Sequence, residues 1–240
     1  MKLSYDIVVV GAGHAGAEAA SAAARLGSRT LLITIDMEKI ASMSCNPAVG
    51  GVAKGQIVRE IDALGGQMAR ITDQSAIQFR MLNRSKGAAM WSPRAQCDKS
   101  EFSRLWRRTL ENTRNLYLWQ DSVTEILLDH TGEKVAVRGV KTRMGVEIEC
   151  RRVVLTAGTF LGGLMHCGTN SAEGGRAGDE ASHGITEQLV SLGFESGRMK
   201  TGTPARLDAR TINFDALEVQ EGDIEPSKFS YDADTQVVKH

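Results

Sequence analysis

The sequence lacks several features that would assign a class of protein at once. Its four cysteines contain no C-x-x-C pair and no Cys/His set at metal-ligand spacing, which excludes the usual patterns of a dithiol redox motif and of a zinc site. Cysteines spaced this widely favour a reducing compartment. The 29 basic and 29 acidic residues cancel, so any nucleic-acid binding must come from local patches and not from net charge.

Long hydrophobic runs and internal repeats are missing as well. The longest apolar stretch, at about residues 153–165, is too short and too rich in glycine to span a bilayer. The chain starts Met1-Lys2-Leu3 and enters a strand pattern at once, without the regions of a signal peptide. We therefore expect a cytoplasmic protein with no membrane span.

The chain opens with a nucleotide-binding fingerprint. An apolar run at 5–10 predicts a buried parallel strand, an alanine-rich helix is predicted over 15–26, and a second strand over 30–35. The turn between the first strand and the helix reads Gly11, Ala12, Gly13, His14, Ala15 and Gly16. Its three glycines suit a tight turn, a close approach to pyrophosphate and close helix–strand packing. We predict dinucleotide binding here; the alternative is a glycine-rich turn without a ligand.

The acidic residue that commonly binds the ribose at the end of the second strand is missing. Thr34 occupies that place, and Asp36 lies two positions further on. This departure argues against a plain NAD-only dehydrogenase and leaves FAD open as the nucleotide.

A second glycine-rich loop, at 44–55, carries Cys45 and leads into a predicted helix. Backbone N–H groups in such a loop can face an anion, and a nearby lysine such as Lys54 activates a thiol by favouring its thiolate. Because Gly50 stands where a second cysteine would lie, we expect single-cysteine nucleophilic chemistry and not a dithiol mechanism. A buried structural cysteine is the alternative.

The remaining periodicity alternates between helix and strand. Helices are predicted over 99–111 and 179–192, and strands over 116–119, 122–128, 135–142, 146–150 and 153–155. We interpret the strands as a β-meander inserted into the nucleotide-binding fold. The glycine-rich segment 174–179 is predicted to precede the second helix, with Ser182 in its first turn, and to form either an anion-binding nest or a plain helix entry.

A local basic cluster lies between residues 80 and 94. It consists of Arg80, Asn83, Arg84, Lys86 and Arg94, with Trp91 among them. Cations beside an aromatic ring can bind phosphate and stack a base, so the cluster is either an RNA-binding patch or an ordinary solvated loop.

Eight motifs occur in order along the chain. They are GAGHAG (11–16), SCNPAVGGVAKG (44–55), REIDALGG (59–66), LNRSKG (82–87), RAQ (94–96), LTAGTFLGG (155–163), GGRAGD (174–179) and RMKTGTPAR (198–206). Together they resemble the glucose-inhibited division protein A family, the tRNA uridine 5-carboxymethylaminomethyl modification enzymes. Two departures, Ala88 and Ala205, stand where the family has proline.

The resemblance implies an FAD enzyme that uses NADH and methylenetetrahydrofolate to modify C5 of the wobble uridine in tRNA. It also implies a partner GTPase and a homodimer. By position, residues 11–16 match the FAD pyrophosphate motif, and Val123 and Ser182 match further FAD contacts. Cys45 matches one of two catalytic cysteines, as a candidate for addition to uridine C6 or for proton transfer.

The fold expected from these observations is α/β: a Rossmann-like FAD-binding fold with an inserted β-meander, plus the start of a second domain. We predict an incomplete FAD-binding domain at 1–200 and the beginning of an inserted nucleotide or substrate domain at 201–240. By resemblance, the second cysteine, the main NADH segment, a later flavin-contacting segment and a GTPase-recruiting tail would lie beyond His240, so we expect an N-terminal fragment. A flavin-dependent oxidoreductase of a small molecule, without RNA, and a binding scaffold remain alternatives.

Overall fold

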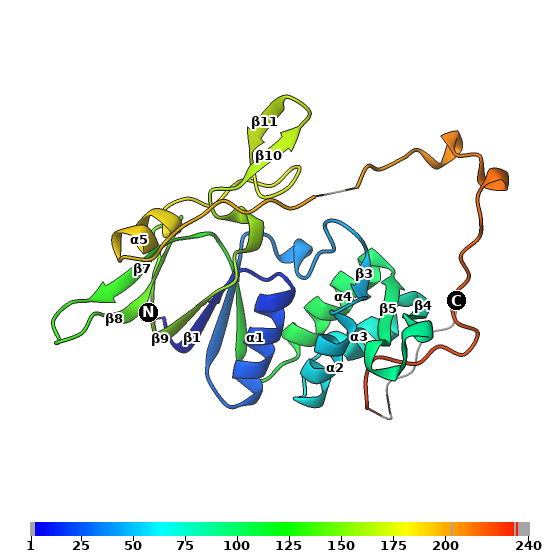
Figure 1. Cartoon of the computed structure of the whole chain (residues 1–240). Coiled ribbons are helices and arrows are strands. Elements are labelled where there is room, and N and C mark those ends of the chain that lie inside the picture. Colours follow the sequence, from blue (N-terminus) through cyan, green and yellow to red (C-terminus); the bar gives the residue numbers. More distant parts are fainter. Residues whose placement is uncertain (1–2, 203, 233, 235–240) are drawn as a thin grey trace. The chain divides into compact units, whose positions relative to one another are not determined.

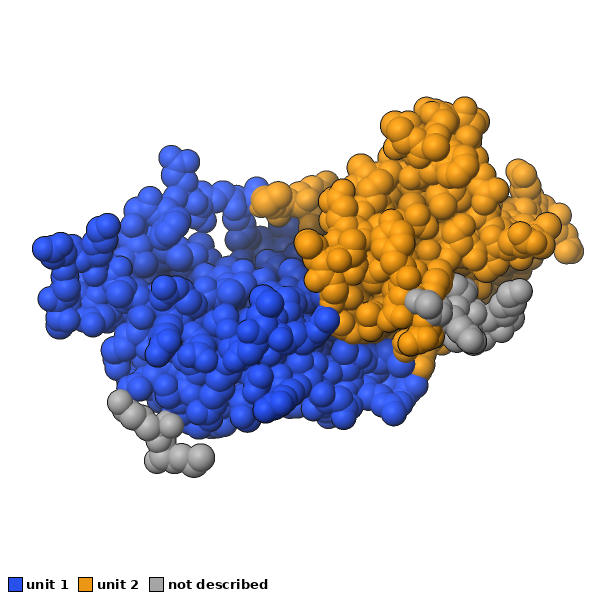
Figure 2. Space-filling view, turned by 90° about the horizontal axis from the view of Figure 1, so that it is seen from below, with its two compact units in different colours: residues 1–42, 103–198 blue, residues 43–102, 199–240 orange. Residues whose placement is uncertain are grey.

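The structure is a computed structural model that describes residues 3–202, 204–232 and 234 (Figure 1). The chain divides into two compact units (Figure 2). Unit 1 comprises residues 1–42 and 103–198, and unit 2 comprises residues 43–102 and 199–240. The predicted division into domains 1–200 and 201–240 stays a prediction.

Unit 1 is built on a six-stranded sheet in the order β6-β2-β1-β9-β8-β7. The parallel part contains β1 (Ser4–Val10), β2 (Thr30–Thr34), β6 (Leu116–Gln120) and β9 (Glu147–Leu155). Helix α1 (His14–Arg25) connects β1 to β2 and contacts both strands. The predicted βαβ opening and the α/β fold class are therefore confirmed.

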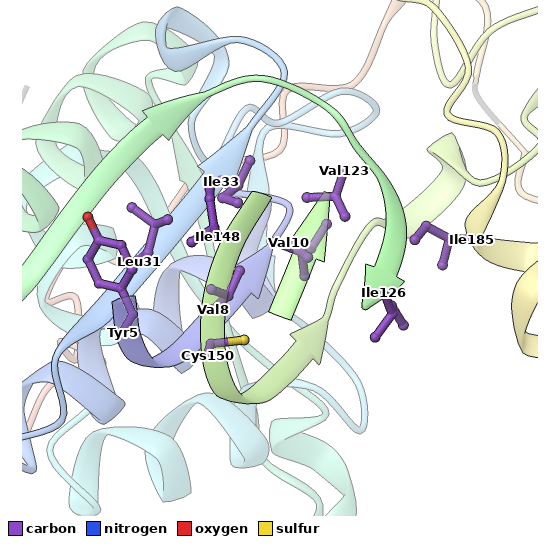
Figure 3. Packing of buried hydrophobic residues seen from close by; sticks show 11 residues of the cluster. Tyr5, Val8, Val10, Leu31, Ile33, Val123, Ile126, Ile148, Cys150 and Ile185 are labelled. Atoms are coloured by element: carbon purple, nitrogen blue, oxygen red, sulfur yellow. The ribbon is translucent and has the colours of Figure 1, made fainter. Parts of the chain in front are cut away.

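The core of unit 1 explains why the first strands are apolar throughout. Val9 and Leu32 are fully buried, as are Ala17, Ala20 and Ala24 of α1, whose small side chains let the helix approach closely. A second cluster gathers Tyr5, Val8, Val10, Leu31, Ile33, Val123, Ile126, Val140, Ile148, Cys150 and Ile185. Figure 3 shows side chains of this cluster from β1, β2, β7 and β9, together with Ile185.

The β-meander consists of β7 (Val123–Asp129), β8 (Ala136–Thr142) and β9, paired antiparallel in that order. Two details of the prediction are wrong. Strand β6 lies at the parallel edge beside β2, and the segments 146–150 and 153–155 form one continuous strand. The exposed pair Arg151 and Arg152 interrupts the apolar pattern without interrupting the backbone pairing.

Two helices of the chain were predicted with different success. Helix α4 (Lys99–Glu111) has the predicted bounds, and Phe102, Trp106 and Leu110 on its apolar face are fully buried. Helix α5 (Ile185–Ser191) starts six residues later than predicted, because Gly184, with φ +98°, ends a non-helical segment immediately before it. Ser182 therefore precedes this helix and does not lie in its first turn.

Unit 1 also contains a hairpin of β10 (Leu164–Cys167) and β11 (Asn170–Glu173). Three-residue 3₁₀ turns lie at Met37–Lys39 and Gly158–Phe160. In the part of the chain that the structure describes, we find no helix long and apolar enough to cross a membrane.

Unit 2 combines an antiparallel sheet with two helices. The sheet has the order β3-β5-β4, with β3 (Ala48–Gly50), β5 (Ser92–Cys97) and β4 (Ala76–Leu82). Helix α2 (Gly55–Ala63) follows the Cys45 loop as predicted, and α3 (Met68–Ser75) is an additional helix. Beyond residue 199 the described chain forms no strand and no α-helix, and it contains short 3₁₀ turns at Ala209–Thr211 and Phe214–Ala216.

The basic segment between residues 80 and 94 is not a simple loop. It forms the tip of the β4–β5 hairpin, where two 3₁₀ turns, Arg84–Lys86 and Ala88–Met90, connect the strands. Arg80 and Arg94 stand opposite each other across the two strands.

Candidate functional site

The nucleotide fingerprint turns sharply at Gly11, directly after β1. Its φ of +96° is a conformation that residues with a side chain rarely adopt. A Cβ at this position would also lie 2.7 Å from the carbonyl oxygen of Thr156. The first glycine of the fingerprint is therefore required by the fold itself.

The last glycine of the fingerprint is required by helix–strand packing. A Cβ on Gly16 would lie 1.8 Å from the Gly11 carbonyl oxygen and 2.6 Å from Oγ1 of Thr156. The Thr156 hydroxyl is within hydrogen-bond distance of the carbonyl oxygens of Val10 and Gly11, at 2.9 Å from each. Thr156 thus closes the turn from β9; its place at the end of an apolar strand, in Thr-Ala-Gly, was the only sequence signal for it.

Gly13 differs from both of these glycines. Its φ of −70° is open to any residue, and among the described residues no atom lies within 4 Å of the position a Cβ would take. Gly13 is the N-cap of α1, whose first backbone N–H groups and positive dipole end suit an anion. Neither the backbone conformation nor the packing requires glycine at this position. A ligand that lies against the backbone would require it, because a side chain would occupy the same space.

His14 is held by the segment that follows β2. Its Nε2 lies 3.1 Å from the carbonyl oxygen of Ala41, and the N–H of Ala41 donates to the carbonyl of Ala12 at 2.8 Å. Partial removal of the ring from water lowers the pKa of His14, an effect that the bond to Ala41 opposes. In this contact the ring nitrogen donates and the Ala41 carbonyl accepts. Of the other fingerprint residues, Ala12 is buried and Ala15 is exposed.

The two other residues assigned to FAD by resemblance come together in unit 1. Val123 begins β7 with its side chain in the core, which leaves its backbone for any ligand contact. The hydroxyls of Ser122 and Ser182 lie 3.4 Å apart, and the Ser182 N–H donates to the Phe160 carbonyl at 2.7 Å. Residues 60 positions apart in the sequence are thus neighbours, which the sequence did not indicate.

The glycine-rich segment 174–179 does not stand where it was predicted relative to α5. It does not lead into α5, and Arg176 forms an ion pair with Asp179, which also binds Lys39. Burial acts to raise the pKa of Asp179, but the hydrogen bonds from Lys39 and Arg176 outweigh it and the pKa is lowered. The predicted placement of this segment directly at a helix start is wrong, because residues 180–184 separate it from α5; anion binding by the segment stays a prediction.

Asp36, two residues beyond the position where a ribose-binding acid is expected, is engaged locally. Its carboxylate accepts the N–H of Glu38 at 2.9 Å and lies 3.3 Å from Nζ of Lys39. The Thr34 hydroxyl donates to the Asp36 carbonyl at 3.4 Å. The ribose-binding residue therefore stays unassigned.

Cys45 lies in unit 2, in the loop that leads through β3 to α2. It is exposed, so the alternative of a buried structural cysteine is wrong. Its Sγ donates a weak hydrogen bond to the Gly202 carbonyl at 3.6 Å, and a guanidinium nitrogen of Arg206 lies 3.5 Å from the Ser44 carbonyl oxygen. Gly202 and Arg206, both of unit 2, therefore contact the Cys45 loop.

The other cysteines give a contrast. Cys167 is exposed, whereas Cys97 and Cys150 are buried. Burial raises the pKa of Cys97 to about 11 and also raises the pKa of Cys150. Both buried thiols are therefore protonated and unreactive at neutral pH. Within the described residues, no group of three or more His, Cys, Asp or Glu side chains could hold a metal ion.

The tip of the β4–β5 hairpin presents the basic cluster. Arg84 donates to the Asp223 carboxylate at 2.9 Å, and the indole N–H of Trp91 donates to the Arg84 carbonyl at 3.2 Å. Lys86 is exposed, and 44% of Trp91 is exposed. The structure thus brings cations and an aromatic ring together on one hairpin, with one cation already paired.

Comparison with known proteins agrees with these motifs. A family model described as glucose inhibited division protein A matches residues 6–239. A tRNA uridine 5-carboxymethylaminomethyl modification enzyme from Porphyromonas gingivalis is 62% identical over 96% of this chain, and one from Bacteroides thetaiotaomicron is 60% identical over 96%. The chain spans 36% of the length of either relative.

Solved structures show the same likeness. A structure of Aquifex aeolicus GidA superposes with a TM-score of 0.92 at 48% identity, covering 97% of this chain and 38% of that one. A GidA-related protein from Thermus thermophilus gives a TM-score of 0.57 at 26% identity, covering 80% of this chain and 69% of that one. From the family model that matches nearly all of its residues and from these relatives, the chain belongs to the glucose inhibited division protein A family.

Proposed function

We propose that this chain is the N-terminal part of an FAD-dependent enzyme that modifies C5 of the wobble uridine in tRNA. Relatives of about 60% identity carry the name of a tRNA uridine 5-carboxymethylaminomethyl modification enzyme, and the chain covers 36% of their length. By the same resemblance, NADH is the reductant, methylenetetrahydrofolate is the one-carbon donor, a GTPase is the partner, and the complete protein is a homodimer.

The observation that carries the nucleotide proposal is the geometry of Gly13. Of the three fingerprint glycines, Gly11 and Gly16 are required by the fold, whereas the place of a Cβ on Gly13 is open among the described residues. That open position at the start of α1 suits the pyrophosphate of FAD, which would receive backbone N–H groups and the positive helix end. Val123, through its backbone, and Ser182 would supply further contacts.

When bound, FAD would supply the redox chemistry that brings the one-carbon unit to the oxidation state of the product. Cys45 is assigned to the uridine. Addition of its thiolate to C6 places electron density on C5, which then attacks the one-carbon unit. Loss of the C5 proton and elimination of the thiolate from C6 restore the C5–C6 double bond. His14 fixes the position of the turn through its contact with the Ala41 carbonyl.

Flavin retention tests the cofactor assignment. After incubation with FAD and gel filtration, the chain is expected to keep visible flavin absorbance in its protein peak, because the fingerprint, Val123 and Ser182 all lie within unit 1. FMN, which has no pyrophosphate bridge, is the matched control and should elute separately. Equal retention of FMN and FAD would contradict a pyrophosphate site, and absence of FAD retention would contradict binding by this chain alone.

The tRNA assignment predicts a local, salt-dependent interface at the hairpin tip. We expect Arg84→Ala with Lys86→Ala to weaken tRNA binding by about tenfold in a gel-shift assay, because each lost phosphate contact removes counterion release. The salt dependence should also become shallower, by roughly one unit of slope per contact.

The matched control for the hairpin is Arg143→Ala with Arg151→Ala, which removes two exposed cations from the meander of unit 1. Equal losses in the two double variants would assign tRNA binding to general charge and not to the hairpin. A protein that binds flavin but shows no salt-dependent tRNA shift would support the oxidoreductase alternative.

A further inference from the structure

Two buried carboxylates in unit 2 bind the backbone of a segment far away in the sequence. Asp73, of which 1% is exposed, accepts the N–H groups of Phe229 at 2.7 Å and Ser230 at 2.9 Å. Asp62 accepts the Ser230 hydroxyl at 2.9 Å and the Tyr231 N–H at 2.7 Å. Four hydrogen bonds from α2 and α3 thus hold residues 229–231.

The neighbouring residues of this segment are bound as well. A guanidinium nitrogen of Arg59 donates to the Lys228 carbonyl at 3.2 Å, and Arg70 forms an ion pair with Asp232 at 2.7 Å. Buried carboxylates are costly unless hydrogen-bonded, and burial raises the pKa of Asp73 in spite of its two N–H donors. Four hydrogen bonds to two buried carboxylates, with an arginine contact on either side, therefore hold this short segment in one position.

The segment places one aromatic ring. Phe229 is 1% exposed and packs edge to face on Phe79 of β4, with ring centroids 5.6 Å apart. Its Cζ would lie 2.6 Å from a Cβ on Gly50, the last residue of β3. Gly50 has φ +82° and a Cβ there would also meet the Pro93 carbonyl oxygen at 2.2 Å, so ring and turn fit without spare room.

Gly50 belongs to the loop that carries Cys45. We propose that Phe229, fixed by Asp62 and Asp73, is a positioning residue for this loop: it packs against the Gly50 turn and so keeps β3, and with it Cys45, in place. Gly202 and Arg206 contact the other end of the same loop. The catalytic consequence rests on the proposed function of Cys45, but the conformational part does not.

Hydrogen exchange with mass spectrometry tests the proposal on the full chain. Phe229→Ala should accelerate exchange in peptides covering 46–56 by at least about tenfold, since an emptied aromatic site loosens its lining. The reporting amides include that of Gly51, which donates to the Pro93 carbonyl at 2.8 Å. Phe229→Leu should restore most of the protection, and Phe214→Ala, which removes an exposed aromatic ring elsewhere in unit 2, should change nothing.

A second pair of variants decides the matter if Phe229→Ala unfolds unit 2, which alkylation of the buried Cys97 would reveal. In Asp73→Asn, only the side-chain oxygen can accept a hydrogen bond. The new NH₂ group therefore faces one of the two backbone N–H groups, and two donors oppose each other. Asp62→Asn neutralises a charge in the same cluster but can pair its amide with the Ser230 hydroxyl. We expect faster exchange at 46–56 in Asp73→Asn than in Asp62→Asn.

Unchanged exchange at 46–56 in a folded Phe229→Ala protein would overturn the proposal, as would equal exchange in the two aspartate variants. In a protein of the relatives' full length, Phe229→Ala should lower the turnover number for tRNA modification with flavin retention unchanged, and Phe229→Leu should rescue it. If Cys45 proved dispensable, the exchange result would still stand, so the two proposals fail separately.

Discussion

Gly16→Ala is expected to destabilise unit 1 severely, whereas Gly13→Ala in the same turn is expected to leave it folded. A methyl group on Gly16 would overlap the backbone carbonyl of Gly11 at 1.8 Å, and backbone cannot move aside as the end of a side chain can. Overpacking typically costs about 1–3 kcal/mol and occasionally more, and a clash with backbone lies at the upper end, about 3 kcal/mol. A loss of that size corresponds to a melting temperature lower by roughly 6–12 °C for a chain of this length, measured by circular dichroism.

Gly13→Ala is the matched control because it adds the same methyl group where none of the described residues stands within 4 Å. Its cost to stability is expected to be at most about 1 kcal/mol, the effect of alanine at an N-cap. Flavin retention should nevertheless be lost, because the methyl group would occupy the space assigned to the pyrophosphate. A Gly13→Ala protein that retained FAD, or a Gly16→Ala protein as stable as the wild type, would contradict the roles assigned to these glycines.

Cys45→Ser is expected to abolish tRNA modification while flavin binding remains. A serine hydroxyl stays protonated at neutral pH and cannot replace a thiolate nucleophile, so the rate should fall by at least about 10³-fold. The assay uses a protein that covers the relatives' full length and contains this segment, with the modified nucleoside in tRNA quantified by mass spectrometry.

Cys167→Ser is the control for this experiment, since Cys167 is the other exposed thiol and lies in unit 1. It should modify tRNA at the wild-type rate. Full activity of Cys45→Ser, or equal losses in both variants, would remove the assigned role from Cys45.

The parts of the fold that follow from local pattern were predictable from the sequence. The opening βαβ unit and α4 have strong periodicity, and their residues are buried as that periodicity requires. The pairing of β4 with β5, and of β5 with β3 in the Cys45 loop, depends on contacts between distant segments, which a charged sequence such as that around Arg84 does not signal.

The candidate site shows the same division. The fingerprint glycines were identified from their spacing, but the sequence does not distinguish the glycines that the fold requires from Gly13, which the fold leaves open. Asp62, Asp73 and Phe229 gave no signal, because ordinary acidic and aromatic residues acquire their role only when unit 2 assembles from two separate stretches of chain.

The continuity of β9 has a consequence for how the inserted meander is aligned. Glu149 pairs with Ser4 on one side and with Gly139 on the other, so a single strand transmits its register from the parallel sheet to the antiparallel one. A slip of one residue in β9 would turn side chains over in both halves together. The position of Val123 at the start of β7 therefore depends, through β8 and β9, on the register of β9 with β1. A change of register in one half of the sheet would also change the other half.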